Sequence, residues 1–277
     1  MTVLAVYGFG LIGASIAAAV RQAEPKTRIV AIDLPHLAEQ PELTVLADEF
    51  VDSSNAQEVR RVVELADCCV LSAPVSVIER EGARLLQWAR VLTDCGSTKR
   101  SIAAAIQNSP RRGRFVLGHP MAGGPEGGAA RARPELFRGQ SWLLCPENSD
   151  ADALACVEAL IARVGAKSAH LSVGAHDRAV AYTSHAPQLL ASALAALTRS
   201  ANAEVAAGPA YRGATRTAGG AEVMWQDIFL ANADQVAVVL RELIAELGEV
   251  AVALERSPAE VAPALRLLAR ARASRVG

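Results

Sequence analysis

The sequence predicts an α/β protein in which a doubly wound, mostly parallel sheet is followed by an all-helical domain. Short apolar runs alternate with helical stretches over the first part of the chain, strand signals stop after Ser172, and the remaining residues are rich in Ala and Leu. Alternating strands and helices place helices on both faces of a parallel sheet. We therefore expect one domain over residues 1–171 and a second domain over residues 172–277.

The expected strands are short apolar runs that end at Gly, Pro or polar residues. They cover residues 3–7, 28–32, 68–72, 91–94, 115–118, 141–145 and 167–171. The helices expected between them cover residues 12–22, 56–64, 77–86, 101–107 and 151–164. This alternation predicts that the strands are buried between two layers of helices.

The last third of the chain predicts three long helices, over residues 175–199, 222–255 and 258–273, with a Gly- and Ala-rich stretch at 206–220. These helices are apolar over much of their circumference, which is typical of helices that are buried. The helical part is too small to cover them all by itself. We therefore expect subunits to pair through this half as a homodimer, with packing against the first domain alone as the alternative.

The composition narrows the class of protein. Hydrophobic residues make up 51% of the chain and charged residues 21%, and 28 basic against 29 acidic side chains give a formal net charge of −1. A near-neutral chain with 4% aromatic residues is not attracted as a whole to nucleic acid or to anionic membranes. No apolar run is long enough to cross a bilayer, and no signal peptide is recognisable. We expect a soluble cytoplasmic protein.

The cysteines do not indicate a metal site. There are five of them, an odd number, and no CxxC pair or Cys/His cluster occurs. A zinc site and a disulfide framework are both disfavoured by this spacing.

A glycine pattern follows the first expected strand. Gly8, Gly10 and Gly13 fit GxGxxG where a strand passes into a helix, which predicts a Rossmann-type dinucleotide site. Gly8 permits the tight turn, Gly10 lets the pyrophosphate approach the backbone, and Gly13 allows close helix packing. The first helical amides, at Leu11 and Ile12, would bind the anion.

The residue that ends the second strand indicates which dinucleotide binds. Asp33 lies 20 residues after Gly13 and can accept hydrogen bonds from the ribose hydroxyls of NAD. It would repel the 2′-phosphate of NADP by about 1–4 kcal/mol at roughly 4 Å. Residues 34–36 (Leu-Pro-His) offer no fixed positive charge, so NAD is favoured. The nicotinamide side of the pocket is expected at Ser72, Ala73 and Pro74.

Five further segments carry a resemblance to one family. They are the D-x-G-S-x-K loop at 94–99, GHPMAG at 118–123, HD at 176–177 with SHxP at 184–187, R-x-x-T-R at 212–216, and MWxDIFxxN at 224–232. In this order and spacing, residues 1 to about 235 resemble the prephenate dehydrogenases and their arogenate-using relatives. The resemblance implies a NAD(P) domain joined to a helical dimerisation domain. It also implies NAD-dependent oxidative decarboxylation of a cyclohexadienol, in tyrosine biosynthesis.

The resemblance and the residue chemistry together suggest the catalytic groups. His119 follows a strand at the carboxyl edge of the sheet, where such folds bind ligands, and an imidazole can accept the ring hydroxyl proton. Its position in the motif matches the catalytic histidine of the family. Ser97 could hydrogen-bond to the same hydroxyl or to the nicotinamide amide, or alternatively cap the helix near Ser101.

The substrate contacts are expected from the second half. Arg216 suits a bidentate grip on the side-chain carboxylate. Arg212 assists it or is simply solvated, and Trp225 lines the ring pocket or belongs to the core. His185, which faces the cleft in the family, and Gln188 complete the expected substrate contacts. We interpret His176 and Asp177 as structural instead, through helix capping and the helix dipole.

Two departures from the family pattern bear on the substrate. Gln188 stands where prephenate-using relatives often have a second histidine, and Gly213 stands where many carry an acid. A changed set of polar groups can alter which substrate is accepted. Prephenate or arogenate is the first expectation, and 4-amino-4-deoxyprephenate of a specialised, antibiotic-type pathway is the alternative.

Two other classes of protein compete with this hypothesis. A β-hydroxyacid dehydrogenase has the same architecture but needs a catalytic lysine in its second half, and no lysine occurs from Ser168 onward. A non-catalytic, dinucleotide-sensing protein on the same fold is the other alternative. The intact His119, Ser97 and Arg216 disfavour it.

Overall fold

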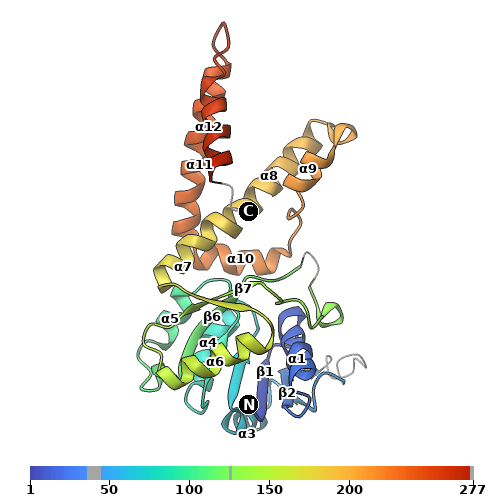
Figure 1. The fold of residues 1–277 in the computed structure, drawn as a ribbon, viewed down its shortest axis with the longest axis vertical. Helices are drawn as coiled ribbons and strands as arrows, with labels where there is room; N and C mark the ends of the chain where they lie inside the picture. The colour runs from blue at the N-terminus through green and yellow to red at the C-terminus, as the bar shows by residue number, and fades with distance from the viewer. Residues whose placement is uncertain (36–44, 125–126, 275–277) are drawn as a thin grey trace.

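The computed structural model describes residues 1–35, 45–124 and 127–274. A sheet domain forms one end of the molecule, and the helices after residue 172 rise from it as two diverging arms (Figure 1). Helix α10 lies between the arms, across the top of the sheet domain (Figure 1).

The sheet has eight strands in the order β3-β2-β1-β4-β5-β6-β7-β8. All neighbours are parallel except β6 and β7, so the mostly parallel sheet predicted from the sequence is confirmed. The strands are β1 (Val3–Tyr7), β2 (Arg28–Asp33), β3 (Glu49–Asp52), β4 (Cys68–Leu71), β5 (Leu92–Asp94), β6 (Phe115–Pro120), β7 (Ser141–Cys145) and β8 (Lys167–His170). The sequence prediction missed β3, because this short edge strand begins and ends on an acidic residue and has no apolar run.

Helices cover both faces of the sheet. They are α1 (Leu11–Ala23), α3 (Ala56–Leu65), α4 (Val75–Leu85), α5 (Arg100–Ile106) and α6 (Ala151–Arg163). The residues of β1 are apolar on both faces because each face packs against a core. Leu4 and Val6 belong to the core that includes α1 and α6. Ala5 and Tyr7 point into the opposite core, which includes α3, α4 and α5. A strand buried on both faces therefore reads as a continuous apolar run.

The helical part differs from the prediction in three places: within two of the expected helices and at the start of the third. It consists of α7 (Val173–Val180), a π-helical turn (Ala181–His185), α8 (Ala186–Ser200), α9 (Pro209–Ala214), α10 (Glu222–Ala231), α11 (Ala233–Leu254) and α12 (Ala262–Ala273). The single helix expected over 222–255 is wrong, because Asn232 leaves the helical conformation and separates α10 from α11. The helix expected over 175–199 is continuous but passes through the π turn. The third helix begins at Ala262 rather than at residue 258.

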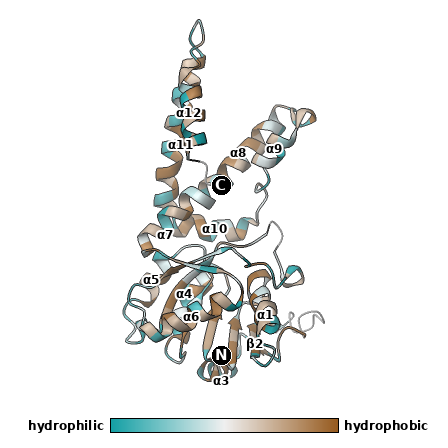
Figure 2. Cartoon of the chain, viewed as in Figure 1, coloured by the Kyte–Doolittle hydropathy of each residue, from teal (hydrophilic) through white to brown (hydrophobic). Residues whose placement is uncertain are grey.

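The two arms expose large apolar side chains. Residues of α8, α11 and α12 that are at least 40% exposed are Leu190, Leu194, Leu197, Val238, Ile244, Leu247, Val252, Leu254, Leu265 and Leu268. Figure 2 shows hydrophobic residues distributed along both arms. An apolar area of this extent is typical of a surface that another protein covers.

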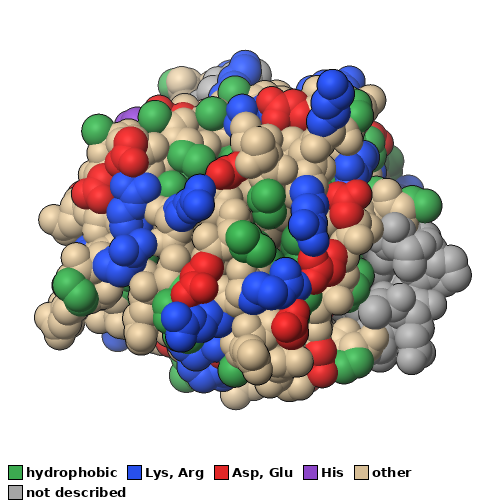
Figure 3. Space-filling view, turned by 90° about the horizontal axis from the view of Figure 1, so that it is seen from below, with side chains coloured by type: hydrophobic (Ala, Val, Ile, Leu, Met, Phe, Trp, Pro, Cys, Tyr) green, Lys and Arg blue, Asp and Glu red, His purple; other side chains and the backbone are tan. Residues whose placement is uncertain are grey.

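The outer face of the sheet domain, opposite the arms, is different. Basic and acidic side chains are interspersed over it (Figure 3). They include ion pairs around α3, such as Arg60 with Glu64 and Arg61 with Glu58. Within the described ranges, no helix combines the length and the apolar character needed to span a membrane.

A buried ion pair joins the ends of β5 and β6. Lys99 and Asp94 are both fully buried, and the Lys99 ammonium donates to the Asp94 carboxylate and, at 2.7 Å, to the carbonyl of Gly118. The carboxylate also accepts the amides of Gly96 at 2.9 Å and Gly118 at 3.0 Å. Both backbone polar groups of Gly118 are therefore held by this pair, directly before His119.

Replacing Lys99 by methionine should lower the free energy of unfolding by about 3–5 kcal/mol, because it leaves the Asp94 charge buried without a partner. Urea unfolding followed by circular dichroism measures the change. Lys26→Met, at an exposed position, is the matched control and should differ little from the unaltered protein. A loss for Lys99→Met as small as that of the control would contradict the assigned role of the pair.

Candidate active site

The glycine loop between β1 and α1 is tightly constrained at two positions. Gly8 has a φ of +90°, and a Cβ atom there would lie 2.3 Å from the carbonyl oxygen of Ser72. A Cβ at Gly13 would lie 2.0 Å from the carbonyl oxygen of Gly8. At Gly10, by contrast, a Cβ would meet nothing within 4 Å. The loop is therefore closed against the protein at Gly8 and Gly13 and open to a ligand at Gly10.

Asp33 is already attached to this loop. One carboxylate oxygen accepts the amide of Phe9, and the other accepts the amide of Leu34 at 2.7 Å. A carboxylate has about four acceptor sites, and the residues that the structure describes fill two of those of Asp33, which leaves two toward the hydroxyls of a ribose. His36, the first residue after Asp33 that can carry a positive charge, lies outside the described residues.

The residues after β4 lie against the glycine loop, where the carbonyl of Ser72 approaches Gly8. The amide of Ser72 donates to the carbonyl of Tyr7 at 2.7 Å, and Pro74 is the residue before the first turn of α4. Strand β4 pairs with β1 on the side opposite β2, so the strand order reverses here. Ligands of doubly wound sheets bind at such a reversal, outside the carboxyl ends of the strands. Leu11 and Ile12 lie in the first turn of α1 and pack partly against the core.

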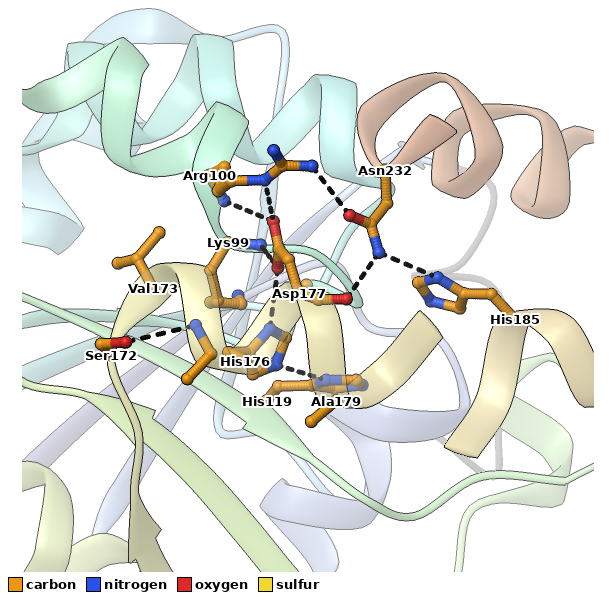
Figure 4. Close-up of polar contacts among 12 residues, drawn as sticks. Lys99, Arg100, His119, Ser172, Val173, His176, Asp177, Ala179, His185 and Asn232 are labelled. Carbon is orange, nitrogen blue, oxygen red and sulfur yellow. Dashed lines mark hydrogen bonds and ion pairs between the residues drawn. The ribbon is translucent and has the colours of Figure 1, made fainter. Parts of the chain in front are cut away.

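A chain of three side chains lies at the carboxyl end of β6. Nδ1 of His119 is 3.0 Å from Nε2 of His176, and Nδ1 of His176 is 2.8 Å from the Asp177 carboxylate (Figure 4). Asp177 also accepts the amides of Lys99 at 2.7 Å and Arg100 at 2.9 Å, and Nε of Arg100 at 3.2 Å. The carboxylate therefore caps the N-terminus of α5, where the helix dipole favours negative charge.

These contacts determine where the protons of the two imidazoles are. Burial raises the pKa of Asp177, but hydrogen bonds from His176 and the α5 amides outweigh burial and keep the pKa below its usual value. An ionised carboxylate only accepts, so Nδ1 of His176 carries a proton and its Nε2 accepts a hydrogen bond from Nδ1–H of His119. The lone pair of His119 is then on Nε2, which has no hydrogen-bond partner among the described residues.

Three histidines of the site are kept neutral. Burial, together with the neighbouring His176 and Lys99, lowers the pKa of His119 well below its usual value. Burial also lowers the pKa of His176, partly offset by Asp177, and it lowers the pKa of His185 to about 4. A neutral imidazole with a free lone pair is the form that accepts a proton.

The expected substrate residues of the helical part gather around the π turn. His185 ends this turn, is 1% exposed, and meets the Trp225 ring edge-on with the centroids 6.1 Å apart. Gln188, one turn later, is buried, and a Cβ at Gly220 would lie 3.4 Å from its amide nitrogen and 2.3 Å from the indole nitrogen of Trp225. His185, Gln188 and Trp225 therefore form one cluster.

Among the described residues, neither of the two arginines hydrogen-bonds to His119. Arg216 follows α9, is exposed, and has no polar partner among the residues described. Arg212 donates to the carbonyl of Ala207 at 2.7 Å. Ser97 is half-buried in the loop before α5 and makes no hydrogen bond within the described residues. The cap of α5 is provided by Asp177, so the alternative role of Ser97 as that cap is wrong.

His176 and Asp177 are the residues whose position the sequence interpretation missed. Capping was the right kind of role for Asp177, but the helix that it caps is α5 and not its own. Both side chains are fully buried; His176 contacts His119, and Asp177 contacts His176. The signal available beforehand was their charge and polarity in a helical half made mostly of Ala and Leu. Among the described residues, no group of three or more His, Cys, Asp or Glu could hold a metal ion.

Comparison with known proteins gives a consistent result. The family model "Prephenate dehydrogenase, nucleotide-binding domain" matches residues 16–170, and "Prephenate dehydrogenase, dimerization domain" matches residues 172–268. The prephenate dehydrogenase of Bacillus subtilis is 30% identical over 265 residues, which cover 91% of this chain and 70% of that protein. The cyclohexadienyl dehydrogenase of Zymomonas mobilis is 28% identical, with 91% and 88% covered.

A solved structure shares the fold. The prephenate dehydrogenase of Aquifex aeolicus, in complex with hydroxyphenyl propionate and NAD⁺, superposes with a TM-score of 0.80 at 24% identity. The superposition covers 98% of this chain and 97% of the other.

The neutral histidines predict how stability depends on pH. The unfolded chain takes up protons at these residues below a pH of about 6.5, whereas the folded chain does not until the lowered pKa values are reached. The free energy of unfolding should therefore fall as the pH drops from 7.5 to 5.5, by up to about 1.4 kcal/mol per pH unit for each histidine. Urea unfolding at several pH values tests this, and His185→Gln should reduce the slope. A stability that is constant between pH 7.5 and 5.5 would contradict the protonation states assigned.

Proposed function

The chain belongs to the prephenate dehydrogenase family, and we propose that it catalyses the NAD-dependent oxidative decarboxylation of prephenate or arogenate to a 4-hydroxyphenyl product. The observation that carries this proposal is His119, a neutral imidazole with its lone pair on Nε2, at the carboxyl edge of the sheet. The reaction belongs to tyrosine biosynthesis. The family assignment also disfavours the β-hydroxyacid dehydrogenase alternative.

His119 removes the proton of the ring hydroxyl. As Nε2 takes that proton, the imidazole of His119 becomes positively charged. Its Nδ1–H donates to His176, which in turn donates to Asp177. The buried carboxylate thus stabilises the charge through two hydrogen bonds, without accepting a proton itself. Ser97 lies in the loop before α5 and supports the same hydroxyl. The hydride leaves the ring carbon for NAD, and loss of the ring carboxylate as CO₂ sends the C–C bonding electrons through the ring, which becomes aromatic. The oxygen then recovers the proton from His119, which gives the 4-hydroxyphenyl product and restores the neutral imidazole.

The glycine loop fits NAD. The amides of Gly10, Leu11 and Ile12 would hold the pyrophosphate, because the loop is open at Gly10 and leads into a helix N-terminus. Gly8 and Gly13 would shape the loop instead, since the Gly8 amide donates to the carbonyl of Ile32 at 2.9 Å and Gly13 packs against the carbonyl of Gly8. Asp33 would hold the adenosine ribose, and Ser72, Ala73 and Pro74 would face the nicotinamide. Bound NAD supplies the acceptor for the hydride that leaves the ring carbon.

Arg216 anchors the carboxylate arm of the substrate. Its guanidinium is exposed and without a described partner, so it is free to bind an anion. Arg212 keeps donors beyond its single bond to Ala207 and assists. Trp225 and His185 line the ring pocket, and Gln188 contacts the side chain of the substrate.

An amino-bearing substrate is the second candidate. The amide of Gln188 is buried beside Trp225 and has no hydrogen-bond partner in the described part of the chain. Its carbonyl oxygen can accept a hydrogen bond from an ammonium group, which a protonated imidazole or a guanidinium could not do. Arogenate and 4-amino-4-deoxyprephenate both carry such a group.

The helical part, residues 172–277 in our division, forms a homodimer. The apolar residues that α8, α11 and α12 expose give each arm a surface that a second copy can bury. The name of the matched family domain supports this assignment. Light scattering of the purified protein should give twice the chain mass of 29.0 kDa.

An assay panel tests the reaction and its substrate. Prephenate, arogenate and 4-amino-4-deoxyprephenate are each incubated with NAD and with NADP, and reduced nucleotide is followed at its near-ultraviolet absorbance. We expect turnover with prephenate or arogenate and NAD, and a much lower rate with NADP. Turnover of the amino-deoxy compound alone would assign the second candidate. Dinucleotide binding without turnover of any substrate would support the sensing alternative.

Replacing His119 by asparagine should lower kcat by about 100-fold or more, because the proton acceptor is lost. The dissociation constant for NAD, measured by calorimetry, should stay close to that of the unaltered protein. His170→Asn is the matched control, since His170 is exposed on β8. Near-normal turnover by His119→Asn would remove His119 from the mechanism.

A further inference from the structure

Asn232 occupies the break between α10 and α11, with φ −131° and ψ 24°, and is fully buried. Its side chain makes three contacts (Figure 4). The amide oxygen accepts Nη2 of Arg100 at 2.9 Å, the amide nitrogen donates to the carbonyl of Asp177 at 2.8 Å, and the same nitrogen is 3.2 Å from Nδ1 of His185. One asparagine therefore joins α5, α7 and the π turn.

These contacts leave one arrangement of the hydrogens. A guanidinium only donates, so the atom of Asn232 that faces Arg100 must be the amide oxygen. The amide nitrogen, which only donates, then faces both the carbonyl of Asp177 and the His185 ring. Nδ1 of His185 must accept, so the ring proton of the neutral imidazole lies on Nε2.

We propose that Asn232 is a positioning residue that keeps the ring proton of His185 on Nε2, so that His185 donates a hydrogen bond to an oxygen of the bound anionic substrate. The assignment of that acceptor rests on the proposed function, whereas the position of the proton rests on the contacts alone. His119 and His185 then have opposite tautomers in one site. His119 presents a lone pair and accepts a proton, and His185 presents an N–H and binds.

The Nε2 atom of His185 is available for this contact. It has no hydrogen-bond partner among the described residues. It is also not among the polar atoms that are buried without a partner, which are Thr93 Oγ1, Thr98 Oγ1, Ser101 Oγ and Trp142 Nε1. Asparagine achieves what an acidic residue could not, because a carboxylate at this place would accept from Nδ1 and leave Nε2 bare.

The charged and titratable groups around His185 come from four elements. They are Asp177 and His176 of α7, Arg100 of α5, Asp234 of α11 and His119 of β6. Asp177 raises the pKa of His185 and His176 lowers it, but burial has the largest effect and keeps the ring neutral. The tautomer is therefore decided by Asn232 and not by a charge.

The position of the proton is tested directly in the unaltered protein. Chains labelled with ¹⁵N-histidine are examined by NMR at pH 7.5, with two-dimensional spectra that correlate ring carbon protons with ring nitrogens. His185→Gln identifies the His185 signals. We expect a protonated Nε2 and a bare Nδ1 for His185, and the reverse for His119. A bare Nε2 on His185 would overturn the proposal, whatever the outcome of the activity assays.

The variant Asn232→Asp should reverse the tautomer. Its carboxylate accepts from Nδ1, so at high pH the NMR signals of His185 should show a bare Nε2, and KM should rise about tenfold or more while NAD binding is retained. At low pH the imidazolium carries both protons, so the KM defect should shrink as the pH falls. Asn108→Asp, at an exposed position, is the matched control and should show neither change.

Two results of the variant experiment would count against the proposal. One is a protonated Nε2 on neutral His185 in Asn232→Asp. The other is a switched tautomer with an unchanged KM at high pH, which would remove the substrate contact. If Asn232→Asp fails to fold, the spectrum of the unaltered protein still decides where the proton lies. Absence of turnover in the unaltered protein would instead contradict the proposed function, leaving the tautomer result intact.

Discussion

The site depends on one buried carboxylate, that of Asp177. It comes from the first helix after the sheet domain, yet it accepts the first amides of α5 and the side chain of Arg100 within the sheet domain. A buried charge is tolerated only when its acceptor sites are filled, and here backbone amides, a guanidinium and an imidazole fill them. The same contacts dock α7 on α5. Helix docking and the protonation of the site are therefore consequences of one set of hydrogen bonds.

Two chains of hydrogen bonds run outward from this point. One passes through His176 to His119, and it starts at an acceptor, so it ends with a lone pair on His119. The other starts at Arg100, a donor, passes through the amide of Asn232, and ends with an N–H on His185. Whether a chain begins at an acceptor or a donor decides which form the last imidazole takes. A catalytic site needs both forms, one to remove a proton and one to bind an oxygen.

The backbone around His119 is held by a second buried pair. Lys99 and Asp94 bind both polar groups of Gly118, and Lys99 also donates its own amide to Asp177. A Cβ at Gly118 would lie 2.8 Å from the carbonyl oxygen of Asp94, so glycine is required there for close approach. The loop between β5 and α5 thus connects the two ion pairs, and movement of either would shift the imidazole. Rigid support of this kind is what proton transfer at a defined distance requires.

The sequence by itself determined the elements whose signals are local. Apolar runs marked the buried strands, because a strand between two helical layers has no polar face, and Gly8 and Gly13 marked a turn that has no room for a side chain. His119 was identifiable because it lies at the end of a predicted strand, at the edge where ligands bind; the structure extends that strand, β6, to Pro120 and keeps His119 near its carboxyl end. Only the tertiary structure decided the rest. Asp177 and the amides of α5 are 77 and 78 residues apart along the chain, and no periodic pattern records such a pairing. The break at Asn232 was hidden for the same reason: helical periodicity continues on both sides of it, and the hydrogen bonds that involve its side chain end on Arg100, Asp177 and His185, which only folding brings together.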